Sequence, residues 1–145
     1  MSENNVEVFV GIDVSKSRLD VQIEPLGESF QVANDDEGIK ALCSRLSKLA
    51  PTLIVMEATG GLETRAASEL AARGLSLAVV NPRQVRDFAK ASGQLAKTDR
   101  IDTYVLCGFG RAIRPAARPM KDALTRLLDD LVTRRRQLVV FRIDE

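Results

Sequence analysis

The 145-residue sequence predicts an α/β fold in which a mixed five-stranded sheet is flanked by helices. Three observations predict it. Three strand-like segments come first, joined by short polar links, as in an antiparallel meander. Two apolar segments follow, each preceded by a segment of helical spacing, which is typical of right-handed β-α crossovers. The composition, 45% hydrophobic and 28% charged, is that of an ordinary globular domain.

The first part of the chain is predicted to form the meander. Its second segment places Leu19, Val21 and Ile23 at every second position, the period of a half-buried strand. The segments before and after it are rich in β-branched and aromatic side chains. The predicted strands cover residues 6–14, 18–25 and 28–34.

Helices and strands then alternate. A helix is predicted to begin at the polar residues 34–37 and to end before Pro51. The continuous apolar run 52–58 predicts a central strand that is covered on both faces. The remaining elements are a helix over 62–73, a strand over 75–81 and a short basic helix from Pro82. This order is that of ribonuclease-H-like folds, in which the first and fourth strands are neighbours.

The last segment, 116–143, is predicted to be one long helix. Its apolar residues follow a four-three spacing that is interrupted by Arg134. At 1.5 Å per residue such a helix is roughly 40 Å long. We therefore expect it to form a coiled-coil contact with a second copy of the chain, and the alternative is a helix that packs along its own domain.

Four carboxylates occupy positions that packing does not explain. Asp13 and Glu57 end buried strands, where an unpaired carboxylate is costly. Asp99 and Asp102 lie one helical turn apart at a predicted helix start. Asp13 is alternatively a turn cap, and a helix cap would explain Asp99 more readily than Asp102. As ligands, the four acids favour Mg²⁺ or Mn²⁺, which activate water or a hydroxyl for attack on a phosphodiester.

Other site chemistries are excluded by composition. The sequence has no histidine and two cysteines, Cys43 and Cys107, so a zinc site and an imidazole base are excluded. Both cysteines lie in apolar contexts and are expected to be small buried thiols. No apolar run approaches about 18 residues and residues 1–7 are polar. We expect an intracellular protein that does not enter the membrane.

The charges suggest a polyanionic partner. Residues 1–80 carry a net charge of −5 and residues 81–145 a net charge of +6. Basic residues bracket the acids, where they would contact nucleic-acid phosphates, although each alone is more readily a surface charge. These candidate nucleic-acid-binding residues are Lys16, Arg18, Arg83, Arg86, Lys90, Lys97 and Arg100.

Four motifs together resemble a known family: GIDVSKSRLDV, VMEATGG, VVNPRQVRDFAKASG and KTDRIDTYVL. They are similar to the amino-terminal domain of the DEDD transposases, a bacterial insertion-sequence family that includes the Piv-type invertases and the bridge recombinases. The resemblance implies a RuvC-like catalytic domain over residues 1–115, with Asp13, Glu57, Asp99 and Asp102 as the metal-binding tetrad. It further implies Mg²⁺- or Mn²⁺-dependent DNA cleavage and strand transfer, assembly on DNA as a homo-oligomer and, in part of the family, a structured guide RNA.

The resemblance also implies a place in the bacterial cytoplasm at the nucleoid, and a second domain. Family members continue into a domain that carries a serine, whereas this chain stops at Glu145. We therefore interpret residues 116–145 as the start of a coiled-coil linker, and we expect recombination to be incomplete without the second domain.

Three alternatives remain open. The first is an inactive nucleic-acid-binding and dimerisation module. The second is a nuclease that acts on Holliday junctions, since fold and acids do not distinguish substrates. The third is an actin-like ATPase or sugar kinase, which would need a glycine-rich turn after Asp13, where the sequence has 14–18 without glycine.

Overall fold

The structure, a computed structural model, describes residues 6–93 and 102–116. The strands in this part of the chain are β1 (Phe9–Val14), β2 (Arg18–Glu24), β3 (Glu28–Ala33), β4 (Leu53–Glu57) and β5 (Leu77–Val80). The helices are α1 (Asp36–Leu49), α2 (Thr64–Ala72), α3 (Pro82–Ala91) and α4 (Thr103–Ile113). Each element up to α3 lies within about three residues of its predicted range. The helix predicted over 116–143 and the boundary near residue 115 fall largely outside the described residues.

The strands form one mixed sheet in the order β3-β2-β1-β4-β5. Strands β1, β2 and β3 pair antiparallel, whereas β4 is parallel to both β1 and β5. Strand β1 therefore lies beside β4, as the ribonuclease-H-like order predicts. Because β1, β4 and β5 run in the same direction, their carboxyl ends share one edge of the sheet.

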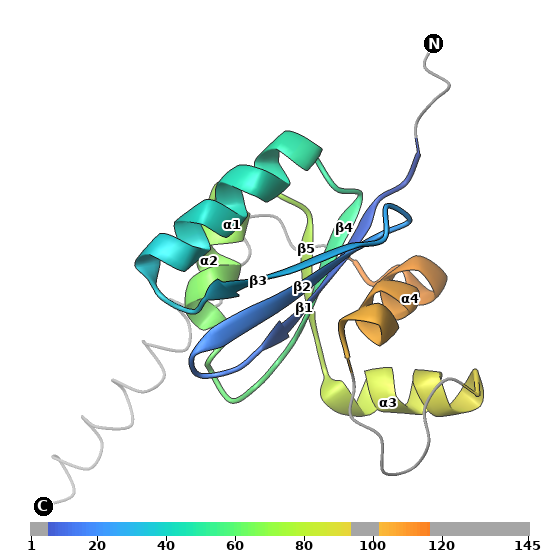
Figure 1. Ribbon diagram of the computed structural model, residues 1–145. Helices are drawn as coiled ribbons and strands as arrows, with labels where there is room; N and C mark the ends of the chain where they lie inside the picture. Colours follow the sequence, from blue (N-terminus) through green and yellow to red (C-terminus); the bar gives the residue numbers. More distant parts are fainter. Residues whose placement is uncertain (1–5, 94–101, 117–145) are drawn as a thin grey trace, which may run out of the picture.

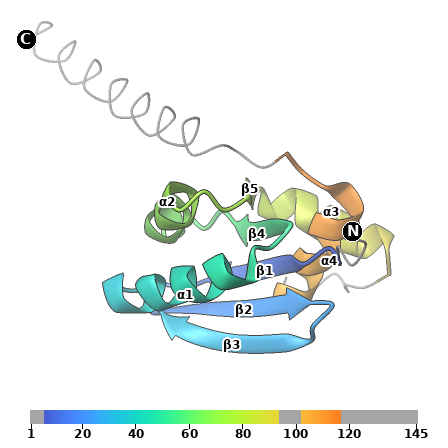
Figure 2. The same cartoon turned by 90° about the horizontal axis from the view of Figure 1, so that it is seen from above.

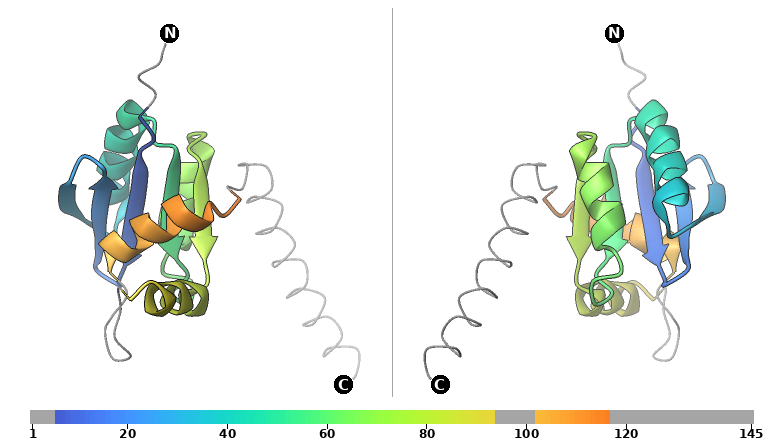
Figure 3. Two further views of the ribbon diagram at one scale, coloured as in Figure 1. Left: turned by 90° about the vertical axis from the view of Figure 1, so that its right-hand side faces the viewer. Right: turned by 90° about the vertical axis from the view of Figure 1, so that its left-hand side faces the viewer.

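The helices cover both faces of this sheet (Figures 1 and 2). Helices α1 and α2 lie on one face, α4 lies across the other, and α3 follows β5 at the carboxyl edge. Figure 3 shows the same layers seen along the sheet. Among the helices of the described residues, none combines the length and apolar character that crossing a bilayer requires.

Two apolar clusters, one on each face, form the core. Alternate side chains of β1 divide between them, because successive residues of a strand point to opposite faces. Val10, Ile12 and Val14 pack with α1 and α2. Phe9 packs with α3 and α4 on the other face. Odd-numbered positions of β1 thus face α4, and this parity decides where Asp13 points.

Helix α4 crosses β1 at Gly11. A Cβ at this position would lie 2.4 Å from the backbone oxygen of Thr103 and 2.9 Å from the Cβ of Leu106. Real Cβ atoms do not approach backbone so closely, so only glycine admits the helix here. The start of α4 is thereby held against β1 at Gly11, which lies two residues before Asp13 in the strand.

Candidate active site at the carboxyl edge of the sheet

Asp13 and Glu57 lie next to each other on adjacent parallel strands. The register pairs Ile12 with Met56, so the following residues of β1 and β4 are neighbours. Both side chains are on the α4 face by alternation, and both residues are partly buried. Adjacent strands are about 4.8 Å apart. The strand ends that carry these two acids are therefore neighbours at one edge of the sheet, as the ribonuclease-H-like order predicts.

The end of β4 is fixed against β5. Glu57 pairs with Val80, and the N–H of Ala58 donates to the carbonyl of Val80 at 3.0 Å. Helix α3 begins two residues later, where Asn81 caps it by accepting from the N–H of Arg83 at 2.8 Å. The start of this basic helix is thus built onto the strand that pairs with Glu57.

Asp102 is the amino-terminal cap of α4. Its Oδ1 accepts a hydrogen bond from the N–H of Val105 at 2.9 Å, and the helix begins at Thr103. We expected both acids of this segment to be metal ligands on one helical turn, and the alternative of a helix cap favoured Asp99; the structure shows the cap at Asp102 instead. The reason is local: an aspartate before Thr-Tyr-Val satisfies a helix N–H that otherwise has no partner. Asp99 itself lies outside the described residues.

Asp20 is a further carboxylate at this site that the sequence analysis missed. It lies directly opposite Asp13 across the β1–β2 pair, and therefore on the same face. Its Oδ1 is enclosed and accepts no hydrogen bond from the described residues, although Arg18 Nε lies 3.3 Å away as an ion pair. The polar alternation Arg18-Asp20-Gln22-Glu24 was the available signal, but it requires the hairpin register to be known.

The donor chemistry at the edge fits a hard divalent cation, because carboxylate oxygens are what Mg²⁺ and Mn²⁺ prefer. Within residues 6–93 and 102–116, no three acidic, cysteine or histidine side chains lie close enough to hold one metal ion. By register Asp13 has two acidic neighbours, Glu57 on β4 and Asp20 on β2, and the described residues do not gather all three around one ion. The predicted ligand Asp99 belongs to the segment 94–101, which the structure does not describe.

The candidate basic residues lie around the same edge. Lys16 is exposed in the β1–β2 hairpin, and Arg18 begins β2 with its side chain 55% exposed. On α3, Arg83 and Lys90 are exposed while Arg86 is partly buried. The two remaining candidates, Lys97 and Arg100, lie outside the described residues.

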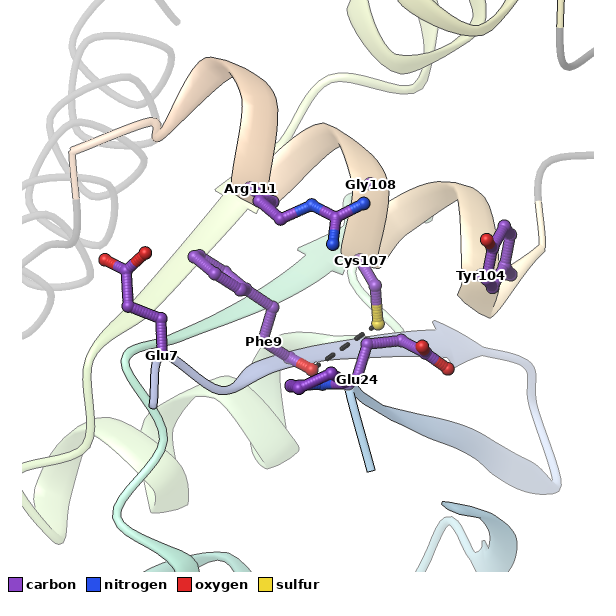
Figure 4. Close-up of a pocket in the computed structure, with 8 residues that line it drawn as sticks. Glu7, Phe9, Glu24, Tyr104, Cys107, Gly108 and Arg111 are labelled. Carbon is purple, nitrogen blue, oxygen red and sulfur yellow. Dashed lines mark hydrogen bonds between the residues drawn. The ribbon is translucent and has the colours of Figure 1, made fainter. Parts of the chain in front are cut away.

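A separate pocket of about 230 Å³ lies at the other end of β1 (Figure 4). It is lined by Phe9, Glu24, Tyr104, Cys107 and Arg111 among others. Phe9 is four residues before Asp13, which is about 13 Å along a strand. This pocket is therefore distinct from the carboxylate edge, and its acids are engaged within the fold.

The two thiols are buried as predicted, and they are expected to be inert. Burial, and next the nearby Glu24, raise the pKa of Cys107 to about 12, and burial also raises the pKa of Cys43. Because the thiolate is the reactive form, neither cysteine should react with a thiol reagent at pH 8 in the native protein. Labelling followed by mass spectrometry should show modification only after unfolding. Rapid native labelling of Cys107 would contradict this packing.

Comparison with known proteins gives a family and a fold. A family model of DEDD transposases of the IS110 type, described as "Transposase", matches residues 10–145. No curated protein matches the chain. The structure is similar to Thermus thermophilus RuvC in complex with a Holliday junction substrate, with 15% identity, a TM-score of 0.54, and coverage of 77% of this chain and 99% of that one. A second Thermus thermophilus RuvC structure has 15% identity, a TM-score of 0.49, and coverage of 76% and 98%.

Proposed function

Because the chain belongs to the DEDD transposase family of the IS110 type, we propose that its carboxyl-edge acids perform divalent-metal-dependent cleavage and strand transfer of DNA. The transposase family and the RuvC-like fold both support phosphodiester chemistry. The single observation that carries the proposal is the adjacency of Asp13 and Glu57 at the ends of two parallel strands. Both acids lie at the carboxyl ends of parallel strands, and open α/β sheets bind their ligands at that edge.

Asp13 and Glu57 would hold Mg²⁺ or Mn²⁺, with Asp99 and Asp102 as further proposed ligands. The cation would supply Lewis acidity, through which a water or hydroxyl attacks phosphorus and the leaving oxygen is stabilised. Asp102 would bind through the oxygen that does not cap α4. In this arrangement the capping bond of Asp102 also fixes the orientation of its carboxylate before substrate arrives.

The basic residues around the edge would position the DNA backbone. Arg83 and Lys90 lie on the exposed side of α3, whose opposite side packs Val85 and Ala89 into the core. Lys16 and Arg18 extend the positive surface past Asp13. Phosphate contacts from these side chains would fix the strand without reading its sequence. Lys97, Arg100 and Arg86 are proposed to contribute in the same way.

Substitution of both Arg83 and Lys90 by Gln is expected to weaken DNA binding and its salt dependence. Each lost phosphate contact lowers the slope of log K against log salt by about 1. Fluorescence anisotropy over a salt series measures both quantities. The double variant Lys40→Gln/Lys48→Gln on α1 removes the same charge from the other face and should leave the slope unchanged. Equal losses in both double variants would contradict a specific role for α3.

The proposed partners follow from the family. We propose DNA as the substrate, a homo-oligomer joined through residues 116–145, and a structured guide RNA as a further partner. Residues 1–115 would form the catalytic domain and 116–145 the beginning of a coiled-coil linker. Size-exclusion chromatography with light scattering, with and without DNA, tests the oligomer.

Nicking of supercoiled plasmid DNA tests the proposed reaction. The chain should convert plasmid to the open-circular form when Mg²⁺ or Mn²⁺ is added, and EDTA should stop the conversion. DNA binding without any nicking in either metal would favour the alternative of a binding and dimerisation module.

A further inference from the structure

The loop between β4 and α2 is organised around the side chain of Glu63. One oxygen of its carboxylate, Oε1, accepts hydrogen bonds from the N–H of Thr59 at 2.9 Å, the hydroxyl of Thr59 at 3.2 Å and the N–H of Gly61 at 3.1 Å. Glu63 is the cap residue of α2, yet its side chain makes no capping hydrogen bond to that helix. The side chain is directed back toward the end of β4 instead.

The loop has little stiffness of its own. Gly60 and Gly61 both have positive φ, at 71° and 105°, in a region that other residues enter at a cost. A Cβ at either position would have no heavy atom within 4 Å, so no neighbouring group presses on this turn. The hydrogen bonds to Glu63 are therefore a principal restraint on its shape.

These hydrogen bonds are made to a charged group. Burial by itself raises the pKa of Glu63, but the hydrogen bonds from the loop outweigh burial and hold the pKa below the usual value of a glutamate. Glu63 is thus ionised at neutral pH, and hydrogen bonds to a carboxylate are stronger than those between neutral groups.

The restraint lies close to the candidate site. Thr59 follows Glu57 by two residues, and the intervening Ala58 makes the last ladder bond of β4, to Val80. The chain after Glu57 is consequently held at two successive residues, first by β5 and then by Glu63. Without Glu63, the ladder bond of Ala58 would be followed by Thr59 and two glycines, and the N–H groups of Thr59 and Gly61 would lose their acceptor.

We propose that Glu63 is a positioning residue for Glu57. By holding Thr59, it keeps the end of β4 ordered, so that the carboxylate of Glu57 is oriented before a cation binds. Ordering a ligand in advance lowers the entropy lost on binding. This inference rests on the function proposed above, because it assigns Glu57 to the metal site.

Titration of the full chain with Mn²⁺ by isothermal calorimetry tests the inference. Glu63→Ala should weaken Mn²⁺ binding by about threefold to tenfold, less than for a residue bonded directly to a ligand. Glu63→Gln keeps an acceptor oxygen and should stay within about twofold of the wild type. Glu69→Ala removes an exposed carboxylate of α2 and should have no effect.

Hydrogen exchange of the same variants separates positioning from misfolding. In Glu63→Ala the amides of Thr59 and Gly61 should exchange faster while the amides of β1 stay protected. Faster loop exchange with unchanged Mn²⁺ affinity would overturn the positioning role, as would an equal loss of affinity in Glu69→Ala. Asp13→Ala distinguishes the two proposals: if it binds Mn²⁺ like the wild type, the metal site itself is wrong. If it loses binding while Glu63→Ala does not, the positioning role alone is wrong.

Discussion

Replacement of Asp13 by Asn is expected to reduce DNA cleavage by at least about 10³-fold, the order seen when a principal catalytic group is removed. Asparagine keeps the size of the side chain and removes the charge that binds a divalent cation. Plasmid nicking in Mg²⁺ and Mn²⁺ measures the change.

The same variant should fold at least as well as the wild type without metal. Asp13 faces Asp20 across the β1–β2 pair, and like charges directly opposite each other destabilise a sheet. A melting temperature that is equal or higher in Asp13→Asn would therefore separate lost chemistry from lost structure. Asp36→Asn is the matched control, because this carboxylate belongs to α1 and is 92% exposed. Retained nicking in Asp13→Asn, or equal loss in Asp36→Asn, would contradict the assignment.

Replacement of Gly11 by Ala is expected to have the largest effect on stability. The new Cβ would meet the backbone oxygen of Thr103 at 2.4 Å and the backbone nitrogen of Cys107 at 3.1 Å. Backbone atoms of a packed helix cannot rotate away, so α4 must shift as a unit. Overpacking of this kind costs about 1–3 kcal/mol, and contact with backbone places this site at the upper end. Thermal or urea denaturation measures the loss.

Gly27→Ala provides the control for Gly11→Ala. Gly27 has a φ of 73° and open space around its Cβ position, so alanine there meets backbone strain without a collision. Gly27→Ala should therefore lower the free energy of unfolding by about 1 kcal/mol. Because α4 carries Asp102, Gly11→Ala should also lower metal affinity, which Gly27→Ala should not. Equal stability of the two variants would contradict the close crossing of α4 over β1.

The sheet was predictable because its signals are local. The alternation of Leu19, Val21 and Ile23, the continuous run 52–58 and the cap residues near Asp35 each reflect burial or hydrogen bonding within a short segment. The neighbouring positions of β1 and β4 followed from connection rules that hold across α/β folds. The crossing of α4 at Gly11 was not predictable, because it depends on the distance between two backbones far apart in sequence.

The site was only partly predictable. Asp13 and Glu57 could be identified because acids at the ends of buried strands need an explanation. Asp20 was missed because its closeness to Asp13 depends on hairpin register, and one residue of slip would have moved it to the other face. The role of Glu63 could not be predicted either. The three donors that bind its carboxylate come together only because the chain turns at Gly60 and Gly61.

A crystal structure of the chain with Mn²⁺, with anomalous scattering to locate the metal, tests the proposed catalytic site most directly. We predict a manganese peak between β1 and β4, with oxygens of both Asp13 and Glu57 about 2.0–2.2 Å from it, close to the values for comparable hard cations. Manganese bound elsewhere, or a site from which either carboxylate is excluded, would contradict the assignment of this edge as the active site.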